Sequence, residues 1–314
     1  MLSYLVRRLF RTIPTLFLVS LIAFSILHLA PGDPAQRMLG AQATKEEIET
    51  YRNQLNLDKP LHVQYVSWVG GILKGDFGRS IFLGGSVSQI LLNRLPVTLS
   101  LAVLAISIAT IFGILLGVWA ASRHGNYGDM VTMAFSYIGI SIPEFVIGLV
   151  LLFIFAVELR WFPIGGYVSV SEGVIQWLRH LVMPALTLGI IHAALIARMT
   201  RANMLEILEK EYVKVARAKG LRERATIWKH AFRNSAISIV TVVGLSFAIL
   251  LGGAFITEVV FSLPGIGKLV VTAVTKRDYP IVQGAMILIA GGVTLMNLIV
   301  DLTYAYLDPR VKYE

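Results

Sequence analysis

The chain has 314 residues, of which 56% are hydrophobic and 15% are charged, and its formal net charge is +9. Because a soluble domain carries roughly 25% charged residues, this composition excludes an ordinary soluble fold and predicts an integral membrane protein. In such a protein an excess of Lys and Arg indicates cytoplasmic loops and contact with anionic lipid rather than binding of nucleic acid. The absence of cysteine excludes disulfides, thiolate metal sites and cysteine nucleophiles.

Six apolar runs come close to the ~20 residues that cross ~30 Å of hydrocarbon. Backbone groups in lipid need partners within the protein, so each run predicts a transmembrane helix. The first run follows three arginines, but it is too long for the apolar part of a secretory signal and no small-residue cleavage motif follows it, which favours an uncleaved span. In the second run, Gly113-x-x-x-Gly117 predicts close packing against another helix. We therefore expect an all-α, polytopic fold with six transmembrane helices, at Thr12–Gly32, Leu95–Ser122, Met130–Val157, His180–Ala197, Asn234–Thr257 and Tyr279–Val300.

The polar segment between the first two runs, residues 31–94, contains two further predicted helices. The sequence PGDP at 31–34 ends the first span. Thr44 and Glu47 have the spacing of a capping box, which predicts that a helix begins there. A second helix is predicted after it, either lying along the membrane surface or packing as a cap over the bundle. Its apolar face would carry Tyr65, Trp68, Val69 and Ile72.

The distribution of Lys and Arg orients the spans. With six spans the two termini lie on one side, together with the turn at Arg123 and the loop Arg198–Arg233, and this side holds most of the Lys and Arg of the short loops. Because such residues are enriched on the cytoplasmic side, we expect both termini to be cytoplasmic. The expected domains are residues 1–94, with the first span and a long extracytoplasmic segment, and residues 95–314, with five spans.

The motifs of common enzyme classes are absent or incomplete. The Gly-Lys pair at 267–268 lacks both the leading glycine and the final Ser or Thr of a phosphate-binding loop, so the chain has no ATP-binding motif of that type. Residues 139–143 resemble a nucleophile turn around Ser141 but end in proline, and a lone Ser141 and His192 in membrane spans more often make interhelical hydrogen bonds. A membrane enzyme that depends on these two residues stays open as an alternative.

Polar side chains inside the spans are expensive in hydrocarbon and are therefore candidates for a transport pathway. Glu258 and Asp301 lie near span ends, where pairing with a neighbouring helix explains them. The same explanation stays open for Glu144, which lies in mid-span beside Pro143. The residues selected as pathway candidates are Ser141, Glu144, His192 and Asn297.

The segment of about residues 201–234, which we call the basic loop, interrupts the apolar runs with many Lys and Arg. Its apolar residues recur at steps of three and four in two stretches, Leu205–Ala216 and Ala225–Phe232, on either side of Gly220. This pattern predicts an amphipathic helix, a glycine break and a second amphipathic helix. Anionic lipid alone would explain the charges, but a stiff element of this length, where a short turn would connect two spans, favours docking into a soluble partner.

The stretch EYVKVARAKGLRERATIWKHAFRN at 211–234 resembles the cytoplasmic coupling loop of ABC importer permeases, in the form found in the dipeptide, oligopeptide and nickel branch. The chain departs from the wider family at Lys214 and Val215, where Glu and Ala are usual, and from the branch at Glu144, where an uncharged residue is usual. Other stretches that resemble this branch are spread along the chain: HLAPGDP at 28–34, GDFGRS at 75–80, ARMTRANMLE at 197–206, FSLPGIGKL at 261–269 and NLIVDLTYAYLDPR at 297–310.

The resemblance implies a type I ABC importer-like permease, one half of a transmembrane pore in a bacterial or archaeal inner membrane. Its implied partners are a second homologous permease subunit, two ATP-binding cassette ATPase subunits that bind ATP and Mg, an extracytoplasmic substrate-binding protein and membrane lipid. This chain itself would bind no cofactor or metal and would have no catalytic residue. The residues implied at the ATPase are Glu211, Ala216, Ala218, Gly220, Leu221 and Arg224. Those implied at the binding protein are Asp76, Phe77, Pro264 and Gly265.

The resemblance also implies the class of cargo. A dipeptide or oligopeptide is expected, with chelated nickel and glutathione-like compounds as alternatives in the same branch. If Glu144 lines the path, it favours a cationic end of the substrate. A self-contained secondary transporter is the more remote alternative; it predicts inverted internal repeats and uptake without ATP, and the two halves of the sequence show no such repeat.

Overall fold

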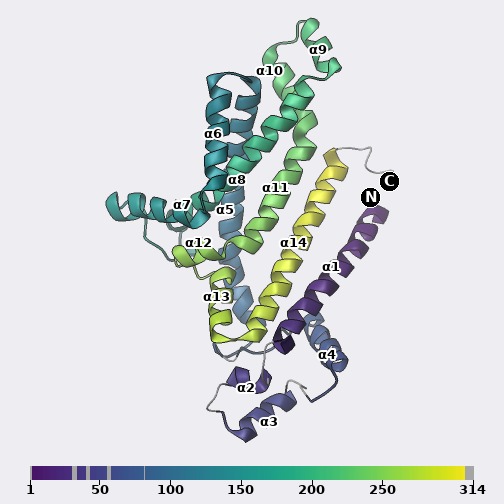
Figure 1. Cartoon of the computed structure of the whole chain (residues 1–314), viewed down its shortest axis with the longest axis vertical. Helices are drawn as coiled ribbons and strands as arrows, with labels where there is room; N and C mark the ends of the chain where they lie inside the picture. Colours follow the sequence, from purple (N-terminus) through teal and green to yellow (C-terminus); the bar gives the residue numbers. More distant parts are fainter. Residues whose placement is uncertain (1, 30–33, 40–42, 55–57, 81, 308–314) are drawn as a thin grey trace.

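The computed structural model describes residues 2–29, 34–39, 43–54, 58–80 and 82–307. Among these residues the regular elements are helices, and strand-like pairing is limited to an isolated bridge between Arg79 and Ser86. The predicted all-α class is confirmed for this part of the chain. Five long helices run lengthwise through the molecule (Figure 1): α1 (Leu2–Leu29), α5 (Val87–Ser122), α8 (Val174–Leu208), α11 (Arg233–Gly253) and α14 (Tyr279–Leu307).

These five helices are long and apolar enough to cross a membrane. A bent pair of helices over 127–158, counted as one span, raises the number of candidate spans to six. The pair meets at an angle of 101°, so the single continuous span predicted for Met130–Val157 is wrong. Pro143 is the cause, because it lacks an N–H and holds Ile142 in an extended conformation, with φ −87° and ψ 127°. The pair consists of α6 (Tyr127–Ser141) and of α7 (Glu144–Leu151) with its π-helical continuation η1 (Leu152–Glu158).

Two of the long helices extend well beyond the apolar runs that predicted them. α5 begins at Val87 and passes Pro96 without interruption, and α8 covers 174–208 although its apolar run covers only 180–197. At 1.5 Å per residue, helices of this length exceed ~30 Å of hydrocarbon. Their polar ends therefore project beyond the apolar layer, where hydropathy carries no signal.

Glycines bring α5 and α8 into close contact. A Cβ added at Gly113 would lie 2.7 Å from the Cβ of Ile196, and one added at Gly117 would lie 2.6 Å from the carbonyl oxygen of Ala197. The close packing predicted for this pair of glycines is confirmed, and the partner helix is α8.

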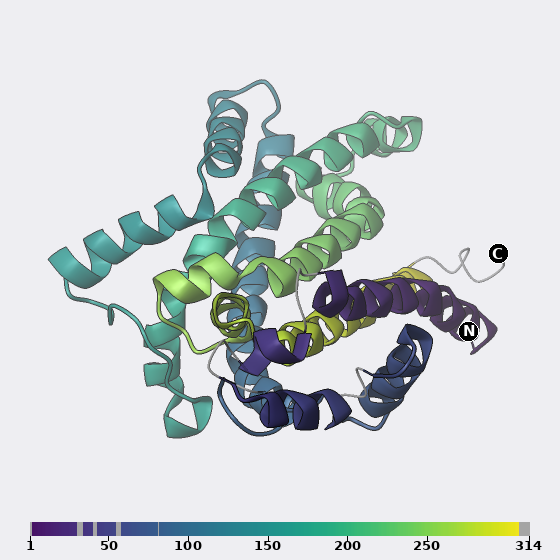
Figure 2. The same cartoon turned by 60° about the horizontal axis from the view of Figure 1, so that its bottom comes forward.

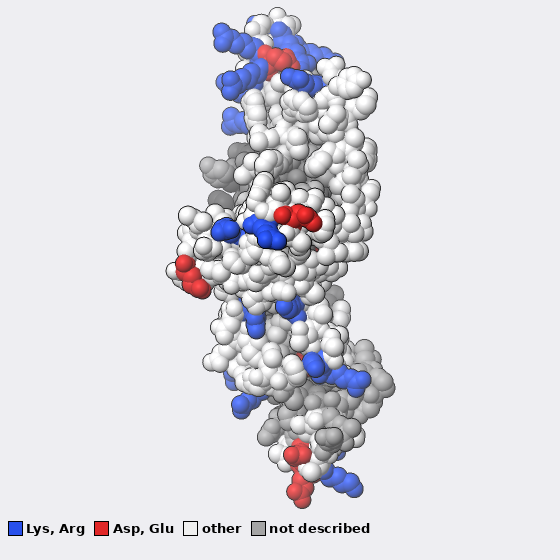
Figure 3. All heavy atoms as spheres, turned by 90° about the vertical axis from the view of Figure 1, so that its left-hand side faces the viewer, with Lys and Arg blue, Asp and Glu red and all other residues white. Residues whose placement is uncertain are grey.

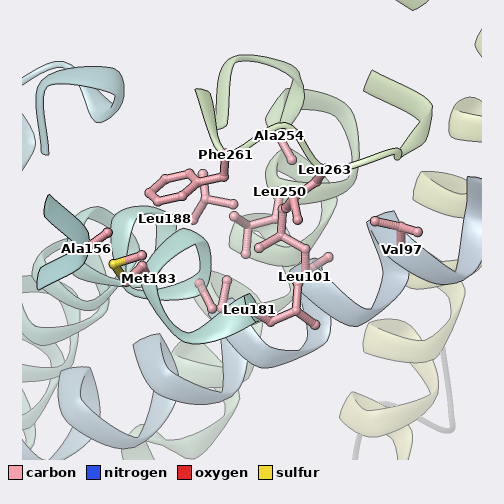
Figure 4. Packing of buried hydrophobic residues seen from close by; sticks show 13 residues of the cluster. Val97, Leu101, Ala156, Leu181, Met183, Leu188, Leu250, Ala254, Phe261 and Leu263 are labelled. Atoms are coloured by element: carbon pink, nitrogen blue, oxygen red, sulfur yellow. The ribbon is translucent and has the colours of Figure 1, made fainter. Parts of the chain in front are cut away.

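The largest buried cluster lies where α5 and α8 meet α11 and the short helix α12 (Phe255–Val260) (Figure 4). Leu101 of α5, Leu188 of α8 and Phe261, which follows α12, are almost completely buried there. Phe261 lies beside Leu188 (Figure 4), so the chain after α11 is held on the bundle. The next helix, α13 (Ile266–Lys276), packs through a second cluster on the start of α5 and α14.

Three short helices precede α5 at one end of the molecule (Figures 1 and 2): α2 (Pro34–Leu39), α3 (Lys45–Gln54) and α4 (Leu61–Leu73). The predicted capping box of α3 is confirmed. Glu47 N–H donates to Thr44 Oγ1 at 3.2 Å, and Thr44 N–H donates to Glu47 Oε2 at 2.8 Å, an interaction that lowers the pKa of Glu47. The turn predicted at PGDP lies outside the described residues, except for Pro34, which begins α2.

The helix α4 packs its aromatic face on α1. Tyr65 Oη lies 2.7 Å from Ser20 Oγ, and the rings of Tyr65 and Trp68 lie 5.4 and 5.8 Å from the ring of Phe24. The predicted helical spacing is confirmed. The helix therefore contacts the bundle through α1, while Leu61, Val66 and Leu73 on its other faces are exposed.

Candidate functional site

The basic loop forms one end of the molecule, which we call the basic end, where Lys and Arg side chains gather (Figures 1 and 3). After α8 the chain forms α9 (Glu211–Ala218), turns at Gly220 and forms α10 (Glu223–Ala225), which continues as the π-helical η3 (Thr226–Phe232). The predicted order of helix, glycine and helix is confirmed. Gly220 has φ +83°, and a Cβ added there would meet no other atom within 4 Å. The left-handed backbone conformation, rather than crowding, therefore favours glycine at this position.

One buried residue of α9 anchors the basic loop to the bundle. Val213 is 0% exposed and belongs to a cluster, which we call the loop anchor, formed with Val118, Ala121, Met204, Leu208 and Ala231. The apolar stripe seen in the sequence does not continue as one buried face, because Tyr212 and Val215 are 48% and 50% exposed. The reason is the break at Glu209–Lys210 between α8 and α9, which changes the rotational phase of the second helix.

Apolar side chains are exposed around the turn between α9 and α10. An open hollow beside this turn is lined by Arg222, Arg224, Ala225 and Trp228. Large apolar side chains next to guanidinium groups, beyond the ends of the long helices, suit contact with a protein surface better than contact with hydrocarbon. The exposed apolar residues are Tyr212, Val215, Leu221 and Trp228.

The residues selected from the sequence for docking all lie on this surface. Glu211 is exposed and pairs with Lys214 at 3.2 Å, and Ala216 is partly buried. The remaining four are exposed: Ala218, Gly220, Leu221 and Arg224.

An ion pair that the sequence did not suggest closes the turn of the basic loop. Arg217 Nη2 and Nε donate to the two carboxylate oxygens of Glu223 at 2.6 and 3.1 Å. The two residues are six positions apart, which is not a helical spacing, so only the turn at Gly220 brings them together. A bidentate pair of this kind holds α9 and α10 in a defined orientation.

At the opposite end of the molecule, the residues selected for a binding protein are mostly structural. Asp76 is exposed and its Oδ1 accepts from Gly78 N–H at 2.9 Å. Phe77 packs against the cluster between α5, α13 and α14. Gly265 is buried against the carboxylate of Glu258, which leaves no room for a Cβ. Of the four, Asp76 is exposed, Phe77 and Pro264 are partly buried, and Gly265 is buried.

The carboxylate of Glu258 joins three helices near this end. Glu258 is 0% exposed; it accepts from Thr98 Oγ1 at 2.6 Å and from Lys268 N–H at 2.9 Å. Thr98 in turn accepts from Ile266 N–H at 2.9 Å. Pairing with neighbouring helices therefore explains this buried acid, as the sequence indicated.

Comparisons with known proteins identify the family. The model described as "Binding-protein-dependent transport system inner membrane component" matches residues 113–313, and the model of the N-terminal part of such membrane components matches residues 1–102. The chain belongs to this family. It is thus a membrane permease subunit and not itself an ATPase.

Relatives of the permease match it from end to end. It is 45% identical over 310 residues, 99% of both chains, to the Sinorhizobium fredii protein named "Probable peptide ABC transporter permease protein y4tP". It is 40% identical over 314 residues, 100% of both chains, to the glutathione transport system permease protein GsiC of Escherichia coli. A solved structure of the MetNI methionine ABC transporter, inward facing, matches with a TM-score of 0.56 and 17% identity, over 70% of this chain and 97% of that one. At this identity the match concerns the fold, which is that of a type I importer permease.

Two of the four pathway candidates of the permease flank the bend between α6 and α7. Ser141 is exposed and its Oγ donates to the Tyr137 carbonyl at 2.8 Å. Glu144 is the first residue of α7 and is half-buried. The exposed face next to it is apolar, with Phe145 and Leu149 of α7 and Phe153 of η1 uncovered.

The other two candidates lie elsewhere. His192 is buried in α8 on the face of Gly189 and Ile196, which pack on α5; at about 100° per residue this face is opposite to Ala194, which contacts α6. Asn297 lies on α14, where it lines a small pocket with residues of α1. The structure thus does not bring the four residues into one site.

Sequence reasoning missed a buried ion pair near the basic end. Asp129, in the first turn of α6, is 5% exposed and accepts from Arg201 Nη2 of α8 at 2.7 Å and from Gly125 N–H at 3.1 Å. His124 Nδ1 lies 3.0 Å from the same carboxylate. The one available signal was that Asp129 and Arg201 both stand near the ends of apolar runs, where an unpaired charge would be costly.

Proposed function

We propose that this permease is the transmembrane subunit of an ATP-driven importer of dipeptides or oligopeptides delivered by a substrate-binding protein. The observation that carries the proposal is the basic loop, a helix–turn–helix with exposed apolar and basic side chains, fixed to the bundle by Val213. Two ATPase subunits, which hold ATP and Mg, would each dock on one such loop. The second loop would belong to a second, homologous permease subunit.

The geometry of the basic loop suits the transfer of movement. Ala216, Ala218 and Gly220 leave space where another backbone can approach, while Tyr212 and Leu221 offer apolar contact. Val213 connects this surface to the ends of α5, α8 and η3 through the loop anchor. When ATP closes the two ATPases together, a shift of the loop would move the ends of these helices. Because the binding protein and ATP would bind the outward-open and inward-open states with different affinities, their binding would switch the pathway from one side of the membrane to the other.

We place the basic end in the cytoplasm and the opposite end outside, on the strength of the charge distribution. Residues 1–94 would then supply the first span and an outer segment, and residues 95–314 the core. Outside, a hollow is lined by Leu83, Tyr167 and Pro264, from three loops distant in sequence, and by Asn93 and Arg94 of α5, among others. Together with Asp76 it is the surface that we assign to the binding protein.

Peptides are the favoured cargo because a relative that matches 99% of the chain carries a peptide transporter name. A glutathione-like compound is the second candidate, since a relative of the same length is named for glutathione transport. Both are peptide-like and carry an ammonium group, which Glu144 at the bend could attract if it faces the path.

The test is uptake by proteoliposomes that contain the purified permease with or without its co-expressed ATPases and second permease. A labelled tripeptide loaded on the binding protein should accumulate only when the complete complex and ATP are both present. Accumulation driven by the permease alone, or by an ion gradient without ATP, would contradict the proposal and favour a secondary transporter.

A further inference from the structure

The carboxylate of Asp129 is held from several sides in a way that fixes its position. Arg201 Nη2 lies 2.7 Å from Oδ2, and Arg201 Nε donates to Oδ1. Gly125 N–H donates to Oδ2 at 3.1 Å. His124 Nδ1 lies 3.0 Å from both Oδ2 and Arg201 Nη2. A bidentate guanidinium–carboxylate pair is directional as well as strong, and this one is shielded from solvent, with 7% of the Asp129 side chain and 20% of the Arg201 side chain exposed.

This ion pair joins the start of α6 to α8. The same end of α6 is also packed on α5, because a Cβ at Gly128 would lie 2.8 Å from the indole ring of Trp119. Arg201 precedes Met204 by three residues and Leu208 by seven, so all three lie on one face of α8, and the latter two belong to the loop anchor. The first turn of α6 is therefore tied to the part of α8 that carries the basic loop.

The far end of α6 is the bend at Pro143, followed by Glu144 and the apolar α7. Between its two ends α6 touches α8 through small residues, as at Gly139 and Ala194, where an added Cβ would lie 3.1 Å away. Such contacts carry no directional bond, whereas the buried ion pair is bidentate and directional. The pair is thus a directional polar contact through which a movement of α8 is passed on to α6.

We infer that Asp129 and Arg201 are positioning residues, which make α6 and the bend follow the basic loop when the ATPases move it. The inference rests on the proposed function for the source of the movement. A purely structural ion pair would stabilise the complex equally in all states. A positioning pair instead keeps the distance between the start of α6 and the end of α8 constant while the rest of the molecule rearranges.

The absence of cysteine makes this distance measurable. Nitroxide labels on Tyr127→Cys, at an 84% exposed site that begins α6, and on Glu209→Cys, just after α8, would report it by pulsed electron paramagnetic resonance. The sample is the full reconstituted complex, without nucleotide and with ATP trapped. We expect one unchanged distance in the parent. In Asp129→Asn the distance should shift or split when ATP is added.

Two further variants complete the test. Glu206→Gln removes an exposed pair with Lys210 that lies close by, and it should behave like the parent. Exchange of the charges, Asp129→Arg with Arg201→Asp, should restore the constant distance. If Asp129→Asn fails to assemble, this double variant is the one that tests the inference. The inference is overturned if Asp129→Asn keeps the parent's constant distance, or if the exchanged pair assembles no better than the single variant. Failure of the parent to bind ATPases would instead contradict the proposed function.

Discussion

Gly220 is the residue on which the shape of the basic loop depends. Its φ of +83° is one that residues with a Cβ rarely adopt, and the turn lets Arg217 and Glu223 pair across it. An added Cβ would also point into open space at the exposed end of the molecule. A side chain there would strain the turn and stand where we place the ATPase.

We predict that Gly220→Arg leaves the permease in the membrane but prevents stable binding of the ATPases. A matched control is Gly75→Arg, because Gly75 has φ +82° and equally open surroundings but lies near α4, at the other end. Both changes carry a backbone strain of about 1–2 kcal/mol. Co-purification of the ATPases should drop at least about tenfold, or ~1.4 kcal/mol, for Gly220→Arg alone; an equal loss for both variants would show that strain, not docking, is responsible.

Two valines of α9 separate anchoring from docking. Val213→Ala should lower the free energy of unfolding by about 2 kcal/mol, since it removes buried methyl groups from the loop anchor. Val215→Ala, at a half-exposed site, should leave stability unchanged and weaken ATPase binding. Thermal unfolding in detergent and co-purification measure the two effects, and the account is in error if the two variants give the same pattern.

Among the helices, α5 and α8 form the rigid pair on which the other elements are placed. Their backbones meet at Gly117, where Ala197 O and Thr200 Cβ would each lie 2.6 Å from an added Cβ. Because one of these neighbours is backbone, it cannot rotate away. The contact therefore requires a residue without a side chain.

Gly117→Ala should accordingly destabilise the permease by about 1–3 kcal/mol, as overpacking does. Gly253→Ala is the matched control, since Gly253 ends α11 with no atom near its Cβ position. That change should be neutral or slightly stabilising. Denaturation curves of both variants in the same detergent measure these two changes in stability. An unchanged stability of Gly117→Ala would refute the close contact.

The sequence predicted these helices to different degrees. Apolar runs located the five long helices and the apolar region of the bent pair. Glycine spacing predicted close packing of α5, but the partner helix, α8, was visible only in the structure. The ends of α8 were not predictable from hydropathy, because a helix continues into water without an apolar signal. Pro143 was visible in the sequence, yet proline occurs both in bends and within continuous helices such as α5, where Pro96 causes no break. Only the packing of the neighbouring helices decides between the two.

At the scale of the whole molecule, the parts of the candidate site formed by residues close together in sequence were predictable. The parts formed by residues far apart in sequence were not. The helix–glycine–helix of the basic loop follows from residues close together in sequence. The pair Asp129–Arg201 spans 72 positions, and Thr98–Glu258 spans 160, so no local pattern reveals them. Phe77 and Gly265 were selected as contact residues, but the tertiary structure uses them for packing.

The most direct test of the account asks whether the basic loop touches an ATPase. Leu221→Cys introduces the chain's sole cysteine beside the Gly220 turn, and Leu73→Cys does so on α4; both leucines are exposed, by 38% and 82%. In intact membranes, a short thiol-reactive cross-linker should join Leu221→Cys to a co-expressed ATPase and should leave Leu73→Cys unlinked to it. No cross-link from Leu221→Cys, in membranes that show ATP-dependent peptide uptake, would contradict the account.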